Sequence, residues 1–482
     1  MTLVMLLWIS VLVALILAFV GDWRFAPEIN IAGSSLTFAA SLMLALEVFR
    51  RGPFTAGGDF FFVDPFNVYL VVLTTLVSTT TAVFSRRYMR VERLHGKVGP
   101  WRMRFYHAMF QLFIFAMLIA LLTNNLGVLW ISMELATLAT VLLVSLYRTP
   151  TAIEAAWKYF ILCGVGIAQA LFGTVLLYFA AERVLGVGSK ALLWTNLSRV
   201  GAQLDPTVLS LAFVFLMVGY GTKAGLVPVH NWLPDAHSEG PTPISAVLSG
   251  LLLNVALYAL VRCKTLVDAS TGTRFAGNMM IGFGLLSLLV AAFSMLRQKD
   301  IKRLFAYSSI EHIGIATFAF GLGGPVAVFG GMLHMLVHSL TKSAVFFSVG
   351  HASQMHGTQE MARIRGLFRG NPTVGWGLML GVMALSGMPP FGLFASEFLI
   401  LTATMKEQPL LAAPLLIGLA VAFAALFRRV QPMVAGVVPP WQQPLRAANV
   451  PVFVHLALVV LFGLYLPDFL SRWFQMAAEL LR

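Results

Sequence analysis

Apolar stretches of about twenty residues recur along the whole chain, and short polar stretches separate them. About 20 consecutive apolar residues make a helix long enough to cross the hydrocarbon part of a bilayer. The apolar positions are helical in period or continuous, without the two-residue alternation of an outer-membrane barrel. The pattern therefore predicts an all-α membrane protein with about 14 transmembrane helices, at residues 2–20, 32–49, 62–85, 106–122, 125–147, 154–181, 207–227, 242–261, 277–296, 302–321, 325–350, 374–402, 410–427 and 450–467.

Two of these helices are interrupted by glycine and proline. The seventh has Gly221, Gly225 and Pro228 around Lys223, and the twelfth contains "SGMPPFG" at 386–392. Discontinuous helices at matching places in two halves are typical of transporters built from repeats. Because the breaks fall five helices apart, an odd number, the repeats are expected to be inverted. The chain would then divide into an N-terminal three-helix segment with a basic loop (1–105), a five-helix repeat of helices 4–8 (106–265), a second repeat of helices 9–13 (277–427) and a C-terminal helix and tail (428–482).

The composition agrees with a membrane protein and its charge indicates an orientation. The 482 residues are 59% hydrophobic and 11% charged, against about 45–50% and 25% in soluble proteins. Lys and Arg gather in the odd-numbered loops, above all at 86–104, so these loops are expected in the cytoplasm and both termini outside the inner (cytoplasmic) membrane. The N-terminus is interpreted as a first span, because it has no basic n-region or cleavage site. The net charge of +13 lies on no soluble domain, which argues against nucleic-acid binding.

Motifs for redox cofactors are missing from the sequence. The two cysteines, Cys163 and Cys263, stand far apart and form no CxxC pair or iron–sulfur framework. The sequence contains no dinucleotide-binding glycine motif after a strand, no P-loop and no H-E-x-x-H. The chain itself is therefore expected to hold neither a redox cofactor nor a metal.

Five charged residues fall well inside predicted helices: Lys158, Lys223, Lys342, Glu134 and Glu397. A charged side chain at the bilayer centre costs on the order of 2.5–3.5 kcal/mol on insertion scales. Such residues usually face a bundle interior or a hydrated path and have a function. These five are therefore the first candidates for chemistry.

Glu134 and Lys223 are predicted to pair. Burial raises a carboxyl pKa and a nearby cation lowers it, while the reverse holds for a lysine. Such a pair can release a proton when one partner moves or changes its charge. The alternatives are a carboxyl that bonds a local hydroxyl or opposing helix, and a lysine that snorkels from a helix end. The broken helix favours the interpretation of Lys223 as a functional, proton-carrying residue, because unwound backbone at membrane depth must line protein or water.

His334, His338 and Lys342 are spaced four and four, which places them on one face of the eleventh helix. Histidine titrates near neutrality and can relay protons. A metal site is an alternative, although no carboxylate and no third His or Cys accompanies the pair on this helix. A merely structural polar seam is another.

Three further residues have two interpretations each. Lys158 begins the sixth helix and could either snorkel or relay protons. His230 and His237 follow the break after Lys223, and could admit protons from the cytoplasm or cap helix ends. Asp64, at the start of the third span, is interpreted as a helix cap.

Several of these motifs resemble one family. "GTKAGLVPVHNWLPDAHSEGPTPISAVLSG" (221–250) resembles the signature of antiporter-like subunits of complex I, Mrp antiporters and membrane-bound hydrogenases. "WISMELATL", "QKDIKRLFAYSSIEHIG", "HMLVHSLTKSAVFFSVG" and "SGMPPFGLFASEFLIL" are similar to its other blocks, in the expected order. The resemblance covers about helices four to thirteen. The block "EAAWKYFILCGVGIAQALFGTVLLYFA" and the compact length are most similar to component F of hydrogenase-4-type complexes.

The resemblance implies 14 helices, two inverted five-helix repeats and a polar axis along the membrane plane. The family's axis residues correspond here to Glu134, Lys223, His334, His338, Lys342 and Glu397. Many members have a lysine or histidine in helix eight, where this chain has Asn254, and asparagine does not titrate. Either water bridges the two halves there, or Lys342 and the histidines reach across. The long lateral helix of some relatives is not expected, because the chain stops about fifteen residues after the last span.

These observations indicate a proton-translocating subunit of a membrane-bound respiratory complex, of the hydrogenase-4 or formate-hydrogenlyase type. The expected partners are other membrane subunits and a peripheral redox arm with iron–sulfur clusters and a NiFe centre. One alternative is a stand-alone or Mrp-like sodium/proton antiporter, which is disfavoured because only two acids lie deep. Another is a membrane module that energises a different partner, such as a bicarbonate-uptake protein.

Overall fold

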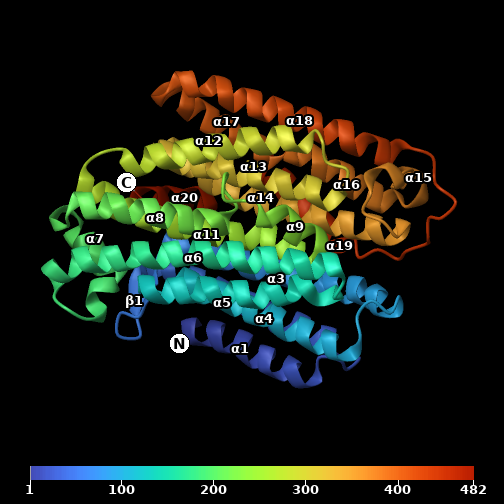
Figure 1. Ribbon diagram of the computed structural model, residues 1–482, viewed down its shortest axis with the longest axis horizontal. Coiled ribbons are helices and arrows are strands. Elements are labelled where there is room, and N and C mark those ends of the chain that lie inside the picture. The colour runs from blue at the N-terminus through green and yellow to red at the C-terminus, as the bar shows by residue number, and fades with distance from the viewer. Residues whose placement is uncertain (1, 482) are drawn as a thin grey trace.

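The computed structural model describes residues 2–481, which form a helical bundle with one small β-hairpin (Figure 1). The helices are α1 (Thr2–Val20), α2 (Ala26–Arg51), α3 (Pro65–Leu94), α4 (Pro100–Leu122), α5 (Leu126–Val144), α6 (Pro150–Leu185), α7 (Trp194–Val200), α8 (Pro206–Ala224), α9 (Trp232–Glu239), α10 (Thr242–Val247), α11 (Leu253–Thr271), α12 (Phe275–Met295), α13 (Ile301–Leu322), α14 (Gly324–His356), α15 (Leu367–Gly370), α16 (Pro372–Leu385), α17 (Gly392–Glu407), α18 (Ala412–Ala435), α19 (Val450–Leu464) and α20 (Asp468–Leu480). The hairpin pairs β1 (Phe54–Ala56) antiparallel to β2 (Phe61–Val63).

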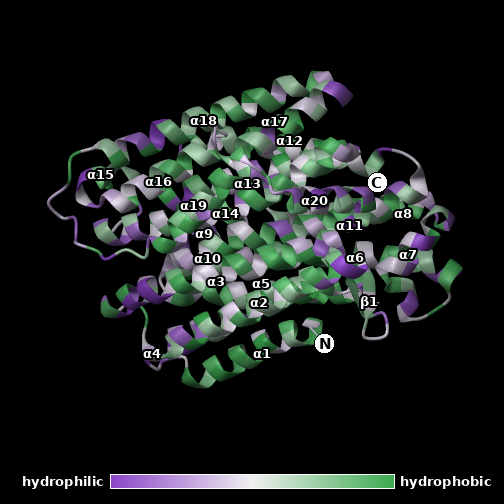
Figure 2. Cartoon of the chain, turned by 180° about the vertical axis from the view of Figure 1, so that it is seen from behind, coloured by the Kyte–Doolittle hydropathy of each residue, from purple (hydrophilic) through white to green (hydrophobic). Residues whose placement is uncertain are grey.

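The bundle is that of a multi-pass membrane protein. Within residues 2–481, 11 helices are long and apolar enough to cross a membrane, or up to 12 if the bent pair α19 and α20 is one span. Figure 2 shows α1 as almost entirely hydrophobic, with hydrophilic residues gathered toward the ends of the bundle. The all-α membrane class predicted from the sequence is therefore confirmed.

Three of the 14 predicted spans do not pass the same test of length and apolarity. The span predicted at 302–321 corresponds to α13, which contains three ionisable residues of the "KRLFAYSSIEH" segment in addition to a histidine. The span at 374–402 is divided between the short helices α16 and α17. The span at 450–467 corresponds to α19, which is followed by a bend of 77° before α20.

Many helices extend beyond their predicted ends, because hydropathy detects only the part that contacts hydrocarbon. The predicted basic loop at 86–104 is mostly helical, since α3 continues to Leu94 and α4 begins at Pro100. The eighth span, predicted to end at 261, continues to Thr271. The predicted C-terminal tail forms α20, where Trp473 Nε1 donates to the Pro65 carbonyl at 2.6 Å.

Local signals define where several helices begin. The Asp64 side chain accepts a hydrogen bond from the Asn67 backbone at 2.8 Å, and the Asn67 side chain accepts one from the Asp64 backbone at 2.9 Å. With Pro65 in the first turn, this forms a capping box for α3, which confirms the cap interpretation of Asp64. Side chains of Asn125, Asp205 and Asp300 accept hydrogen bonds from backbone N–H groups in the first turns of α5, α8 and α13 and cap these helices, without the reciprocal bond of a capping box.

Both predicted helix breaks occur. The seventh span ends at Ala224, with Gly225 at φ 73° as its C-cap, and the chain resumes helical structure at Trp232. Neighbouring groups satisfy freed backbone atoms there: Trp232 Nε1 donates to the Thr222 carbonyl at 2.7 Å, and Val227 N–H donates to Ser287 Oγ at 2.9 Å. The twelfth span is interrupted between Leu385 and Gly392.

The 33-residue helix α14 is the centre of the bundle. It packs against α3, α10, α13, α16, α17, α19 and α20, which come from all parts of the chain. Nearly every residue from Ala327 to Ala352 is buried, including its histidines and Lys342. Polar groups on α14 are therefore enclosed by protein, which is the setting that a buried site needs.

Candidate functional site

Lys223 and Glu134 form an ion pair deep in the bundle. Lys223 occupies the last turn of α8, directly before the break, and is fully buried. Its Nζ lies 3.5 Å from Glu134 Oε2 on α5, and the Glu134 side chain keeps 23% exposure. Lys223 Nζ also donates to the hydroxyl of Thr137. Since positions 134 and 137 are neighbours on one helix face, α5 supplies both partners of the lysine.

Three buried imidazoles meet where α13 packs on α14. His312 Nδ1 and His334 Nε2 are 3.2 Å apart, and His334 Nδ1 is 3.0 Å from Ser396 Oγ on α17. The His338 ring lies 5.3 Å from the His312 ring, between centroids. The predicted clustering of His334 and His338 thus includes a third histidine from another helix. His312, His334 and Ser396 form a hydrogen-bonded path from α13 through α14 to α17, and the His338 ring packs beside it.

The same cluster contains groups that could bind a metal. Ligand atoms of His312, His334 and Glu397 all lie within 4.8 Å of one another. No carboxylate or third histidine accompanies His334 and His338 on α14 itself, but α13 and α17 bring both kinds of ligand beside them. However, both ring nitrogens of His334 already have hydrogen-bond partners, and a metal ligand must offer one of them as a free lone pair. The contacts accordingly favour a hydrogen-bonded chain.

Glu397 lies near the break between α16 and α17. Its carboxylate faces Gly387, which has φ 62°, so closely that a Cβ at Gly387 would collide with Glu397 Oε2. Glu397 Oε1 is enclosed and, among residues 2–481, has no hydrogen-bond partner. The second break thus resembles the first in placing an ionisable side chain beside unwound backbone.

Lys342 lies two turns after His334 and is fully buried, with Nζ 3.0 Å from the Phe305 carbonyl that accepts its hydrogen bond. Glu311, on α13, is only 1% exposed. Glu311 and His312 were not predicted as candidates from the sequence, and the expectation that only two acids lie deep in the membrane is therefore wrong. The signal was present, because Glu311 falls in the middle of the predicted tenth span, as Glu134 does in the fifth.

Asn254 lies between the two groups of charged residues, as the comparison of motifs predicts. It is buried, and its Nδ2 donates to Ser339 Oγ at 2.7 Å and to the Met335 carbonyl at 3.3 Å. One turn earlier, Ser249 Oγ is 2.7 Å from Ser309 Oγ on α13. A π-helical turn at Leu248–Leu252 precedes Asn254. Uncharged hydrogen-bonding groups therefore connect the α10–α11 span to α13 and α14.

Lys158 does not belong to the buried group of charged residues and histidines. Its side chain is 49% exposed and lies 2.6 Å from Glu154 and 3.4 Å from Asp235, in ion pairs at the surface. This geometry fits the snorkelling interpretation.

His230 and His237 differ in burial. His230 is 9% exposed, with its ring 6.3 Å from Tyr307. His237 is fully buried and stacks on Phe346 at 5.2 Å, and within residues 2–481 neither ring nitrogen has a hydrogen-bond partner. Its ring therefore caps no helix end.

A second buried ion pair went unpredicted. Arg262 Nη2 is 2.6 Å from Asp64 Oδ2, and both side chains are at most 3% exposed. The guanidinium also lies 4.5 Å from the Trp194 ring centroid and 5.1 Å from that of Tyr258. The predicted span ended at 261, which assigned Arg262 to a loop. The pair joins the start of α3 to α11 and has a structural role.

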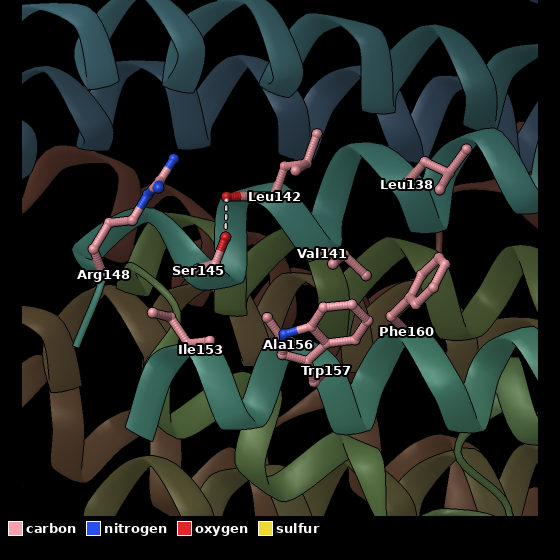
Figure 3. Close-up of a pocket in the computed structure, with 9 residues that line it drawn as sticks. All are labelled: Leu138, Val141, Leu142, Ser145, Arg148, Ile153, Ala156, Trp157 and Phe160. Carbon is pink, nitrogen blue, oxygen red and sulfur yellow. Dashed lines mark hydrogen bonds between the residues drawn. The ribbon is translucent and has the colours of Figure 1, made fainter. Parts of the chain in front are cut away.

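A groove between α5 and α6 lies near Glu134 and belongs to the lipid-facing surface (Figure 3). Leu138, Leu142, Trp157 and Phe160 are among its mostly apolar lining residues, and Arg148 is its one charged group. Glu134 is one turn before Leu138 but does not line it. The groove therefore offers no path for protons to the ion pair.

Comparison with known proteins shows to which family the chain belongs. A family model described as "NADH:quinone oxidoreductase/Mrp antiporter, TM" matches residues 123–423, more than half of the chain. A protein of Methylacidiphilum infernorum named hydrogenase-4 component F homolog is 48% identical over 97% of both chains. Hydrogenase-4 component B of Escherichia coli is 29% identical over 70% of this chain and 49% of its own length.

Solved structures show the same fold. A chain of the archaeal membrane-bound sulfane sulfur reductase, a respiratory membrane complex, matches with a TM-score of 0.89 at 24% identity, over 99% of this chain and 97% of that one. A chain of respiratory complex I from Thermus thermophilus matches with a TM-score of 0.83 at 21% identity, over 100% and 99%. The breaks, the buried charged residues and these similarities agree: the chain belongs to the NADH:quinone oxidoreductase/Mrp antiporter family of transmembrane subunits.

Proposed function

We propose that this chain is a proton-translocating subunit of a membrane-bound respiratory complex of the hydrogenase-4 type. The observation that carries the proposal is the ion pair of Lys223 and Glu134 beside a broken helix. The relative named hydrogenase-4 component F homolog supports the type of complex. Partner membrane subunits and a peripheral arm with iron–sulfur clusters and a NiFe centre would supply the redox energy.

The proposed architecture has 14 transmembrane helices in two inverted repeats of five. α13, the α16–α17 pair and the α19–α20 pair would complete the 11 helices that are long and apolar enough by themselves. The broken α8–α9 and α16–α17 spans support the repeats, since each places an ionisable residue beside its break. The basic residues at 86–104 would face the cytoplasm, with both termini outside.

Proton transfer would begin at the Lys223–Glu134 pair. The pair is stable while Lys223 is an ammonium and Glu134 a carboxylate, because each charge offsets the cost of burying the other. If Glu134 gains a proton, the buried ammonium loses its counter-charge and gives up its own proton more readily. Lys223 would thus release a proton toward the interior whenever the charge on Glu134 is neutralised.

The released proton would then cross to the second half of the chain. The hydroxyl pair of Ser249 and Ser309 and the contact of Asn254 with Ser339 lie between the halves, and water would complete the path to them. Lys342 and the histidine chain would receive the proton. Glu397, beside the second break, would pass it to the far side of the membrane.

Vesicles that contain the assembled complex provide the test, with a pH-sensitive dye inside. Lys223→Ala and Glu134→Gln should each abolish redox-driven proton transport while the complex still assembles. Lys158→Ala is the matched control, because this lysine pairs with acids at the surface. Normal transport in both Lys223→Ala and Glu134→Gln would refute the pathway. Purification without hydrogenase-type subunits would refute the assignment to that type of complex.

Sodium/proton antiport remains the second candidate, because Glu311 is a third acid, beside Glu134 and Glu397, inside the predicted spans. The Mrp-type neighbours support it at the level of fold, with a TM-score of 0.83 for a chain of the Mrp complex from Dietzia. Carboxylates that converge on unwound backbone can bind Na⁺. A proton gradient that collapses on addition of NaCl, but not of choline chloride, would favour this function.

A further inference from the structure

A polar cavity of about 540 Å³ opens at the end of the bundle where α3 ends and α4 begins. Its lining comes from α3, α4, α6, the α9–α10 connection, α13 and the end of α14. The titratable residues in this lining are Tyr88, Glu92, Lys97, Arg102, Tyr147, Glu239 and Lys302. None of them belongs to the proton pathway described above, although the pathway needs an opening to water on each side of the membrane.

Glu92 and Gln354 line this cavity, and each has one buried oxygen without a hydrogen bond. Glu92 is 1% exposed, and its Oε1 accepts a hydrogen bond from Gln354 Nε2 at 2.7 Å. Glu92 Oε2 lies 3.3 Å from the exposed ammonium of Lys97. Within residues 2–481, Glu92 Oε2 and Gln354 Oε1 accept no hydrogen bond. Buried oxygens of this kind normally accept hydrogen bonds from water, so the cavity wall offers binding sites for water.

Lys302 connects the cavity to the broken helix. It is 2% exposed, and its Nζ donates to the carbonyls of Ser238 at 3.1 Å and Gly240 at 2.6 Å. The Ser238 carbonyl lies in the last turn of α9 and the Gly240 carbonyl in the connection between α9 and α10, which leads from the break at Lys223 to the span with Asn254. The lysine therefore holds this connection in place.

His237 lies directly before the connection that Lys302 holds. Its ring is fully buried and both nitrogens lack a hydrogen-bond partner in the described chain. A second string of hydrogen bonds also leads inward, from Tyr147 to the Tyr88 hydroxyl at 3.4 Å, to which Thr242 at the start of α10 donates at 3.1 Å. Two sets of polar groups thus lead from the cavity to the end of α9 and the start of α10, close in sequence to His237.

We propose that this cavity is the opening through which water and protons reach the buried axis from the side of the basic 86–104 segment. The Glu92 carboxylate takes a proton from cavity water and returns it to water that contacts the His237 ring. Lys302 is a positioning residue that keeps the α9–α10 connection open to that water. This inference rests on the proposed proton transport, and names the place where protons enter the chain before they reach the Lys223–Glu134 pair.

Access of water is tested without any measurement of transport. Gln359 lines the cavity near Ser238, and both native cysteines are buried, so Gln359→Cys gives a single reporter thiol. A membrane-impermeant thiol reagent should label it in the assembled complex from the side of the 86–104 segment only. Thr404→Cys, at a fully buried position of α17, is the control and should stay unlabelled. No labelling of Gln359→Cys from that side would overturn the proposal.

The role of Glu92 is tested by transport in vesicles. Glu92→Gln keeps the size and the hydrogen bond from Gln354 but removes the titrating group, and should slow proton transport at least about tenfold. Glu92→Gln should also shift the pH dependence of transport. If Glu92 had only a structural role, this pH dependence would stay unchanged. The control is Glu47→Gln, at a partly exposed acid that pairs with Arg51 on α2. It should leave the rate of transport and its pH dependence unchanged.

The outcomes separate this inference from the proposed function. If Lys223→Ala stops transport but Glu92→Gln has the native rate and pH profile, the cavity is not the opening and this inference alone fails. If Lys223→Ala and Glu134→Gln also transport normally, the proposed function fails as well. Lys302→Met should slow transport, and Lys302→Arg, which retains donors for the two carbonyls, should restore part of the rate; equal rates in both would contradict the positioning role.

Discussion

The ammonium of Lys223 lies 3.5 Å from the carboxylate of Glu134, but only the carboxylate is partly exposed. Lys223 is enclosed on all sides, whereas the Glu134 side chain retains 23% exposure at the surface of α5. A proton or a charge from outside the chain can therefore act on Glu134 first. In the proposed proton transfer, this asymmetry would give the pair a direction, with Glu134 as the group that receives the signal and Lys223 as the group that responds.

The asymmetry predicts how single and double variants of the pair differ. Lys223→Met removes the charge that Glu134 offsets, whereas Glu134→Gln leaves a buried ammonium without its counter-charge. Loss of one partner of a buried pair costs about 3–5 kcal/mol, and partial exposure of the Glu134 left behind should keep the cost of Lys223→Met at or below about 3 kcal/mol. The double variant Glu134→Gln/Lys223→Met should regain most of this stability but transport no protons. Thermal unfolding in detergent and transport in vesicles would measure the two effects, and a double variant that is the least stable of the three would contradict the pairing.

Gly387 is predicted to be essential for the position of Glu397. A Cβ at this residue would collide with the Glu397 carboxylate, and φ of 62° is itself unfavourable for alanine. Gly387→Ala should therefore displace the carboxylate and reduce proton transport at least about tenfold, as expected for a misplaced proton-transfer group. Gly282→Ala is the matched control, because no atom lies within 4 Å of a Cβ there. Equal transport by the two variants would show that Glu397 does not need its present position.

The helices and breaks could be predicted from the sequence because their causes are local. Apolar length sets each span, and the residues that end the seventh helix, such as Gly225, stand beside Lys223 in the chain. The depth of Glu134 and Lys223 was likewise evident from their apolar surroundings. Their pairing could be inferred because two isolated opposite charges in a bilayer each need a partner.

Contacts between distant segments could not be predicted in the same way. His312 bonds His334 only because α13 packs on α14, and a single sequence contains no signal for this register. Lys302 was placed at the first residue of the tenth span and Arg262 just after the eighth, since hydropathy places a charged helix end at the membrane edge even when neighbouring segments enclose it. Asn254 was located by motif, but its hydrogen bond to Ser339 depends on how α11 meets α14.

Asn254 is predicted to act through its hydrogen bonds and not by titration. Asn254→Leu removes the donor to Ser339 and the Met335 carbonyl, so transport should fall at least about tenfold while Lys223 and Glu134 remain in place. Asn254→Gln, which retains an amide on a longer side chain, should be less severe. Asn254→Lys adds a titrating group at the usual family position, and a rate no higher than that of the native chain would show that none is needed there. Native transport by Asn254→Leu would exclude this residue from the path.

The buried pair of Arg262 and Asp64 should contribute to stability and not to transport. Its atoms lie 2.6 Å apart between nearly inaccessible side chains, and aromatic rings surround the guanidinium. Arg262→Ala should lower the free energy of unfolding by about 3–5 kcal/mol, because Asp64 would keep a buried charge without a partner. Lys264→Ala, two residues later, removes a pair with Asp268 on the same helix and should cost less than about 1 kcal/mol. Denaturant unfolding in detergent would compare the two variants. Proton transport by whatever Arg262→Ala complex assembles should match the native rate per complex, and a selective loss of transport would instead place this pair on the proton path.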